Sequence, residues 1–156
     1  MEREIYSARK NKKENERKRM KKEIIIVIVI AIAIIILNNT TNRYTKSNFS
    51  YIENQLDEIR QIAMNLNEEK ENGKTEQQDE LTKKIEFMES EWEKINQKTS
   101  FYLEHDELEK VNSSMVKFKS YFELEEYTDA IPELENCKYI LKHIQDKESM
   151  NPINLF

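Results

Sequence analysis

The sequence predicts an all-α protein, in which a single N-terminal transmembrane helix precedes an up-down-up-down antiparallel helical bundle of three to four helices. Three observations lead to this fold class. Fourteen apolar residues run without interruption from Ile24 to Leu37. The chain has one glycine and two prolines, which leaves little turn chemistry for a sheet, and 35% of its residues are charged. Beyond residue 45, apolar residues recur at spacings of three and four, as in coiled-coil-like helix packing.

The run from Ile24 to Leu37 (IIIVIVIAIAIIIL) is expected to be the membrane anchor. Fourteen helical residues rise about 21 Å, less than the roughly 30 Å of a hydrocarbon core. Twelve of them are Ile, Val or Leu, each favouring insertion by about 0.3–0.6 kcal/mol, so polar flanks can be drawn in and the span is expected at 24–41. No small-x-small motif follows the run, which favours an uncleaved signal anchor over a cleaved signal peptide.

Residues 1–23 form a basic tail that predicts the orientation of the anchor. The tail holds ten Lys and Arg against five Glu, while the whole chain has a net charge of −5, so the remainder carries −10. Positive flanks stay cytoplasmic, which places the tail inside and residues 45–156 outside the cell membrane in a single-pass arrangement. An exterior domain of this charge is not expected to bind nucleic acid, and a single cysteine excludes an internal disulfide.

The exterior part is expected to form helices at about 47–72, 76–103, 107–125 and 129–147. Each carries an apolar seam at alternating spacings of three and four. The seams contain Phe49, Ile52, Leu56, Ile59, Ala63 and Leu66, then Leu81, Ile85, Met88, Trp92 and Ile95, extending through Thr99 to Tyr102, then Leu108, Val111, Met115, Phe118 and Phe122, and finally Tyr127, Ala130, Leu134, Cys137, Leu141 and Ile144. Four amphipathic helices with short connections can close a bundle.

Several large seam residues are expected to build the core rather than a binding site. Trp92 lies in register with its seam, which favours core packing over ligand stacking. Phe118, Leu134 and Leu141 are assigned the same structural role. Cys137 is also in register and is expected to be a small buried apolar residue.

Helix ends are predicted from capping residues. Thr75 is expected to open the second helix in a capping box, within a polar tip at 67–80 that contains no apolar residue. Asp106 is expected to cap the third helix, and Thr128 or Asp129 the fourth.

With these elements placed, the chain resembles a family of short, uncharacterised membrane-anchored proteins of low-GC Gram-positive bacteria. The resemblance covers the anchor and about residues 81–156. It is carried by Trp92, His105-Asp106-Glu107-Leu108, Tyr121, Asp129-Ala130, Leu134, Leu141-Lys142-His143-Ile144 and Asn154-Leu155-Phe156. It implies an N-terminal anchor, an extracytoplasmic helical domain of unknown function and no established activity. The long tail and extended first helix depart from the family pattern.

Two histidines form the one constellation with candidate chemistry. In an antiparallel hairpin, His105 and His143 fall at the same end, near Asp106 and Glu107, where imidazoles and carboxylates can bind a divalent metal. The favoured interpretation is structural: Asp106 caps a helix, and a hydrogen-bonded histidine pair holds the helix ends together. One glycine excludes phosphate-binding glycine loops, and no catalytic residue or cofactor site is predicted.

Two functions remain open. The favoured one is a non-enzymatic, extracytoplasmic module that binds or scaffolds another membrane or envelope protein, and homo-oligomerisation is left open. The alternative is a ligand- or metal-responsive sensor, or a weak hydrolase, centred on His105 and His143. Leu155 and Phe156 are candidates for partner binding, because a free tail rarely ends in exposed apolar residues. The up-down order should place them, with both histidines, at the end of the bundle nearest the anchor.

Overall fold

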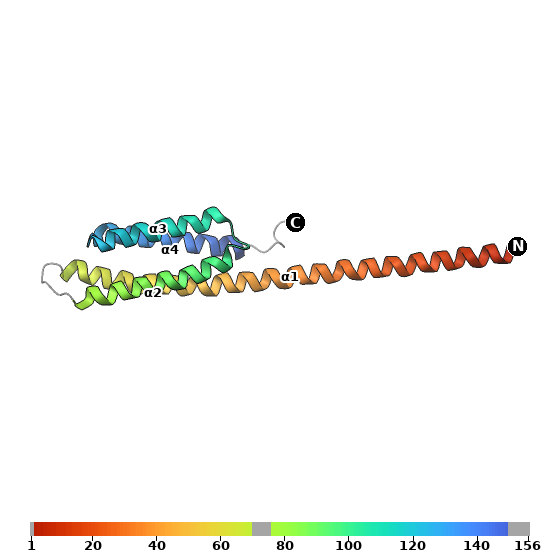
Figure 1. Ribbon diagram of the computed structural model, residues 1–156, viewed down its shortest axis with the longest axis horizontal. Helices are drawn as coiled ribbons and strands as arrows, with labels where there is room; N and C mark the ends of the chain where they lie inside the picture. The colour runs from red at the N-terminus through yellow and green to blue at the C-terminus, as the bar shows by residue number, and fades with distance from the viewer. Residues whose placement is uncertain (1, 70–75, 150–156) are drawn as a thin grey trace. The chain divides into compact units, whose positions relative to one another are not determined.

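A computed structural model describes the backbone of residues 2–69 and 76–149, and the side chains of 13–68 and 78–148. The described chain is helical and contains no strand (Figure 1), which confirms the all-α prediction. Its helices are α1 (Glu2–Glu69), α2 (Glu76–Thr99), α3 (His105–Glu123) and α4 (Tyr127–Ser149). The chain divides into two compact units, Met1–Thr40 and Thr41–Phe156.

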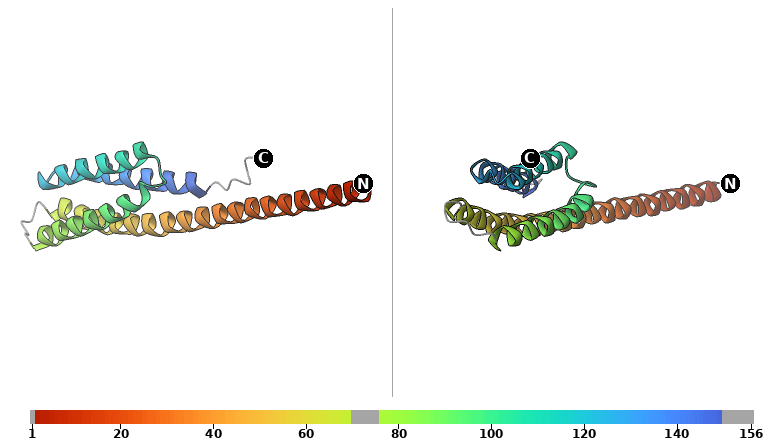
Figure 2. Two further views of the ribbon diagram at one scale, coloured as in Figure 1. Left: turned by 45° about the vertical axis from the view of Figure 1, so that its right-hand side comes forward. Right: turned by 60° about the vertical axis from the view of Figure 1, so that its left-hand side comes forward.

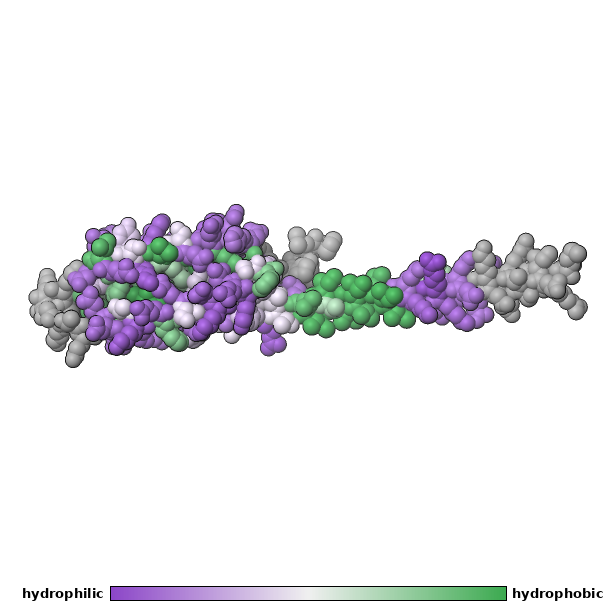
Figure 3. Space-filling view, viewed as in Figure 1, coloured by the Kyte–Doolittle hydropathy of each residue, from purple (hydrophilic) through white to green (hydrophobic). Residues whose placement is uncertain are grey.

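The first unit is the N-terminal part of α1. All twelve Ile, Val and Leu side chains from Ile24 to Leu37 are 51–66% exposed, and they form an unbroken apolar band (Figure 3). In the described part of the chain, one helix contains a stretch long and apolar enough to cross a membrane, and it is this one. The preceding polar turns carry helix-surface ion pairs, such as the one between Arg19 and Glu23.

The second unit is an antiparallel bundle in which each helix packs beside its neighbours in the sequence, and α4 closes the ring against α1. Both views of Figure 2 show α3 beside α4, over the pair made by α2 and residues 41–69 of α1. Phe49 of α1 packs against Trp92 of α2 with ring centroids 5.6 Å apart. The Lys119 ammonium of α3 lies 2.7 Å from a carboxylate oxygen of Glu89 on α2.

Contacts between the remaining neighbours complete the ring. The Ser114 hydroxyl of α3 donates to the Glu133 carbonyl of α4 at 2.9 Å. The Gln145 amide of α4 donates to the Glu53 carboxylate of α1 at 2.6 Å. In each pair of neighbouring helices the two chain segments run in opposite directions, as the predicted up-down-up-down order requires.

Every apolar residue of the four predicted seams is buried in the core except Tyr102, which is partly buried and packs against it. Trp92, Phe118, Leu134 and Leu141 are among them. The core also takes in Leu103, which lies in the connection between α2 and α3. The bundle therefore closes its apolar interior without using any residue of the run from Ile24 to Leu37.

The helix ends differ from the predicted ones. The second helix was expected to reach 103, but α2 ends at Thr99, and the amides of Tyr102 and Leu103 both donate to the Thr99 carbonyl in a turn. This turn lets Leu103 enter the core. Asp106 is not the N-cap of α3: Glu104 occupies that position without a side-chain capping bond, and Asp106 lies in the first turn, where an acid favours the helix dipole.

The fourth helix also starts earlier than expected. α4 begins at Tyr127, so Thr128 and Asp129 lie within its first turn rather than capping it. The chain reverses at Glu125, whose φ of 58° is in the left-handed region, and the Glu126 amide donates to the Tyr121 carbonyl to close α3. The first helix was expected to begin near 47, but α1 is helical from Glu2. Thr75 and residues 70–74 of the predicted tip lie outside the described residues.

Candidate functional site

The end of the bundle that contains Thr45 is called here the proximal end, because it follows the apolar run most closely in sequence. It comprises Tyr44, Thr45, Lys98, residues 100–107 and the last turns of α4. The hydroxyls of Thr45 and Tyr102 share a hydrogen bond of 2.9 Å, which ties α1 to the α2–α3 turn. Thr45 is buried, and burial raises the pKa of the Tyr102 phenol.

An ion-pair cluster joins the start of α3 to the last turns of α4. The Lys147 ammonium lies 2.9 Å from Oε1 of Glu107 and 3.0 Å from Oε2 of Glu104. Glu107 is only 7% exposed, and its second oxygen is buried without a hydrogen-bond partner among the described side chains. Hydrogen bonds to these two carboxylates raise the pKa of Lys147. The two helix ends, which a histidine pair was predicted to hold together, are therefore joined by Lys147.

Both histidines lie on exposed positions. The His143 ring stacks on Tyr139, one turn earlier in α4, with centroids 6.4 Å apart and 15° between the planes. Glu107 pairs with Lys147, and Asp106 is exposed. Across the described side chains, no group of three or more His, Cys, Asp or Glu is arranged to hold a metal ion.

Glu148 adds a further carboxylate to this end. It is partly buried, and its pKa is raised first by desolvation and then by the negative charges of Glu107 and Glu104, against the lowering effect of Lys147. A small cavity of about 120 Å³ opens beside it between α1 and α4. Its lining consists of Asn42, Arg43, Thr45, Lys46, Gln145 and Glu148.

Phe101 is the feature of the proximal end that the sequence pattern did not reveal. It lies in the α2–α3 turn and is 89% exposed, more than any other large apolar side chain among the described residues. The sequence placed it inside the second helix, where it would occupy an ordinary surface position. At the same end of the bundle, the Lys98 ammonium lies 5.7 Å from the centroid of the Tyr44 ring.

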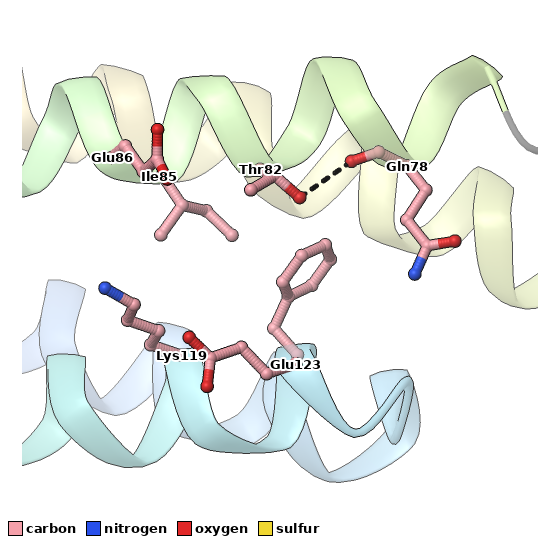
Figure 4. A pocket seen from close by; sticks show the side chains of 7 residues that line it. Gln78, Thr82, Ile85, Glu86, Lys119 and Glu123 are labelled. Atoms are coloured by element: carbon pink, nitrogen blue, oxygen red, sulfur yellow. Dashed lines mark hydrogen bonds between the residues drawn. The ribbon is translucent and has the colours of Figure 1, made fainter.

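A second cavity lies at the opposite end, between α2 and α3, with a volume of about 280 Å³ (Figure 4). Thr82 and Ile85 of α2 face Lys119 and Glu123 of α3 across it. Two of its polar side chains already have structural partners: Thr82 donates to the Gln78 carbonyl at 3.0 Å, and Lys119 pairs with Glu89. This arrangement is typical of a packing groove between helices rather than of a reaction site.

Cys137 is fully buried in the core, as expected. Desolvation raises the pKa of its thiol to about 12. A thiol of this kind is neutral at physiological pH and is a poor nucleophile. The partner-binding candidates Leu155 and Phe156 lie outside the described residues.

Comparison with known proteins places the bundle in a family. No curated protein and no solved structure matches the chain. A family model described as Domain of unknown function (DUF4363) matches residues 37–155, from the last residue of the apolar run through the bundle. The protein therefore belongs to this uncharacterised family, DUF4363.

Proposed function

We propose that this protein is a membrane-anchored, non-enzymatic module whose helical bundle binds or scaffolds another membrane or envelope protein outside the cytoplasm. The observation that carries the anchoring is the exposure of all twelve large apolar side chains from Ile24 to Leu37, beside a bundle core that is complete without them. A continuous apolar helix surface of this kind is unstable in water, and a bilayer is the environment that covers it.

The orientation follows from the ten basic residues in the tail at 1–23. The test is protease added to intact cells that produce the chain with one epitope tag at each end. The C-terminal tag should be lost and the N-terminal tag spared, and both should be lost after the membrane is permeabilised. Loss of the N-terminal tag alone in intact cells would reverse the proposed topology.

A binding role is supported by the character of the bundle surface. Several of its ion pairs, such as Arg60 with Glu135 at 2.7 Å, join neighbouring helices. Such a bundle offers faces for another protein, and its described side chains contain no group of three or more His, Cys, Asp or Glu arranged to hold a metal ion.

The partner test is cross-linking of the full chain in its own membrane, followed by mass spectrometry. The matched control carries Leu155→Ser and Phe156→Ser. We expect a membrane or envelope protein to be linked to the natural chain and depleted in the control. Equal recovery with both chains would show that the tail is not part of the binding surface. The absence of any specifically linked protein would contradict the binding role.

A further inference from the structure

We propose that the α2–α3 turn is a second membrane contact, in which the Phe101 ring inserts into the interfacial layer of the bilayer that holds the anchor. The occupant of this exposed surface is lipid. The inference rests on the proposed anchoring by residues 24–37 and goes beyond it, because it assigns a lipid contact to the bundle itself.

The first step is the exposure of Phe101 in an ordered turn. Its ring is 89% exposed, while the next two residues are held in place. Tyr102 bonds to Thr45, Leu103 is buried in the core, and the amides of both donate to the Thr99 carbonyl at 3.0 and 2.8 Å. The turn therefore fixes the Phe101 ring on the outside, and a large apolar side chain so exposed gains free energy from any apolar cover.

The second step is distance along the chain. Crossing a hydrocarbon core takes about 20 helical residues, six more than the apolar run supplies, so its polar flanks are drawn in as far as about Thr41. Thr45 follows four residues later, which corresponds to roughly 6 Å of helix rise. This is within the interfacial layer, which is about 5–8 Å thick on each side of the core. The hydrogen bond between Thr45 and Tyr102 holds the α2–α3 turn beside this part of α1.

The third step is the chemistry of the neighbouring side chains. Tyr44 with the Lys98 ammonium over its ring, and Tyr102 beside them, are the aromatic and basic types that gather at membrane–water interfaces. Glu104 and Asp106 follow on exposed positions and keep the insertion shallow, because carboxylates remain in the aqueous headgroup layer. The contact is consequently driven by the apolar ring, so it does not require anionic lipid.

The test uses the full chain reconstituted in phosphatidylcholine vesicles, with a nitroxide on Phe101→Cys. Cys137 is buried with a pKa of about 12, so the label reacts at the new thiol. The matched control is Leu124→Cys, which is also an apolar residue after a helix end, 66% exposed, at the opposite end of the bundle. Collisions with lipid-soluble oxygen and with a water-soluble nickel complex report the depth of each label.

We expect the label at 101 to collide more with oxygen than with the nickel complex, and the label at 124 to show the reverse. Vesicle flotation is measured first. A chain that fails to float contradicts the proposed anchoring and this inference with it. A chain that floats, but whose label at 101 is as accessible to nickel as the label at 124, overturns this inference alone. Protection at 101 in native membranes but not in pure lipid vesicles would assign the surface to a protein instead, and would also overturn it.

A second measurement keeps the natural size of the side chain. Phe101→Trp is made in a Trp92→Phe background, with Leu124→Trp in the same background as the control. Lipids brominated near the headgroup should quench the fluorescence of the tryptophan at 101 and leave the one at 124 unquenched. Equal, weak quenching at both positions would contradict the lipid contact.

Discussion

The indole Nε1 of Trp92 donates a hydrogen bond of 2.6 Å to Oδ1 of Asn112, while the indole ring packs against Phe49. One side chain on α2 thus touches both neighbouring helices, an apolar contact on α1 and a polar one on α3. Trp92 is 4% exposed, so its N–H needs a protein partner, and Asn112 supplies it. The arrangement fixes the rotation of α2 between its two neighbours.

Replacing Trp92 with alanine should cost about 3–5 kcal/mol of unfolding free energy, because it opens a large cavity at a junction of three helices. The measurement is urea unfolding of a fragment covering 41–156, which retains the bond between Thr45 and Tyr102. Asn112→Ala is the polar control, and we expect it to cost about 1–3 kcal/mol by leaving the indole N–H unsatisfied. A loss below about 0.5 kcal/mol for Trp92→Ala would be typical of a surface position and would contradict this role.

The core could be predicted from sequence because helix periodicity alone determines which face is buried. Trp92, Phe118 and Leu134 fall at alternating spacings of three and four, and each is buried as that spacing requires. The proximal end could not be predicted in the same way. Phe101 owes its exposure to a turn that begins at Thr99, and the same turn places Leu103 in the core.

The pairing of charged side chains could not be predicted from the sequence either. Lys147 meets Glu104 and Glu107 across two helices, and nothing in the local spacing of these residues distinguishes them from the many other charges. The histidines were singled out by their rarity and by the hairpin topology. The topology was correct, but it does not determine ring direction, and His143 faces Tyr139 along its own helix.

Metal addition should leave the stability of the bundle unchanged. We expect the melting temperature of the 41–156 fragment to be the same with and without Zn²⁺, and likewise for His105→Ala and His143→Ala. The reason is that His143 stacks on Tyr139, and the buried carboxylate nearby, Glu107, is occupied by Lys147. A real site would add about 2.7 kcal/mol at a metal concentration of one hundred times Kd, and either substitution would abolish that gain. Such a result would favour the sensor alternative.

The thiol of Cys137 should be unreactive in the folded protein. Burial in the core raises its pKa to about 12, so little thiolate forms at neutral pH and reagents cannot approach it. We expect reaction with a disulfide reagent to proceed only at the rate of unfolding, and to become fast in denaturing urea. An engineered thiol at the exposed position Ser113 is the control, and it should react at once without urea. Rapid labelling of Cys137 under native conditions would contradict its burial.

Removing the charge of Glu148 should stabilise the bundle at neutral pH and have no effect in acid. Burial and the neighbouring charges of Glu107 and Glu104 raise the pKa of this carboxyl in the folded state above its unfolded value. The folded protein therefore holds the proton more tightly, and the stability associated with this group is greatest below the unfolded pKa. It falls as the pH rises from the unfolded toward the folded pKa, and at pH 7 the ionised carboxylate is a net cost.

Glu148→Gln keeps the shape of the side chain and abolishes that cost, so its unfolding free energy at pH 7 should exceed that of the natural chain. The gain should stay below about 1 kcal/mol, because the group remains partly in contact with water. Below about pH 4, where the natural carboxyl is protonated in both states, the two chains should be equally stable. Glu109→Gln, an exposed change at the same end of the bundle, is the matched control and should alter stability by less than about 0.5 kcal/mol at pH 7. A Glu148→Gln chain that is less stable than the natural one at pH 7 would mean that the ionised carboxylate makes a favourable contact, and that the balance between Lys147 and the two glutamates is the reverse of the one described.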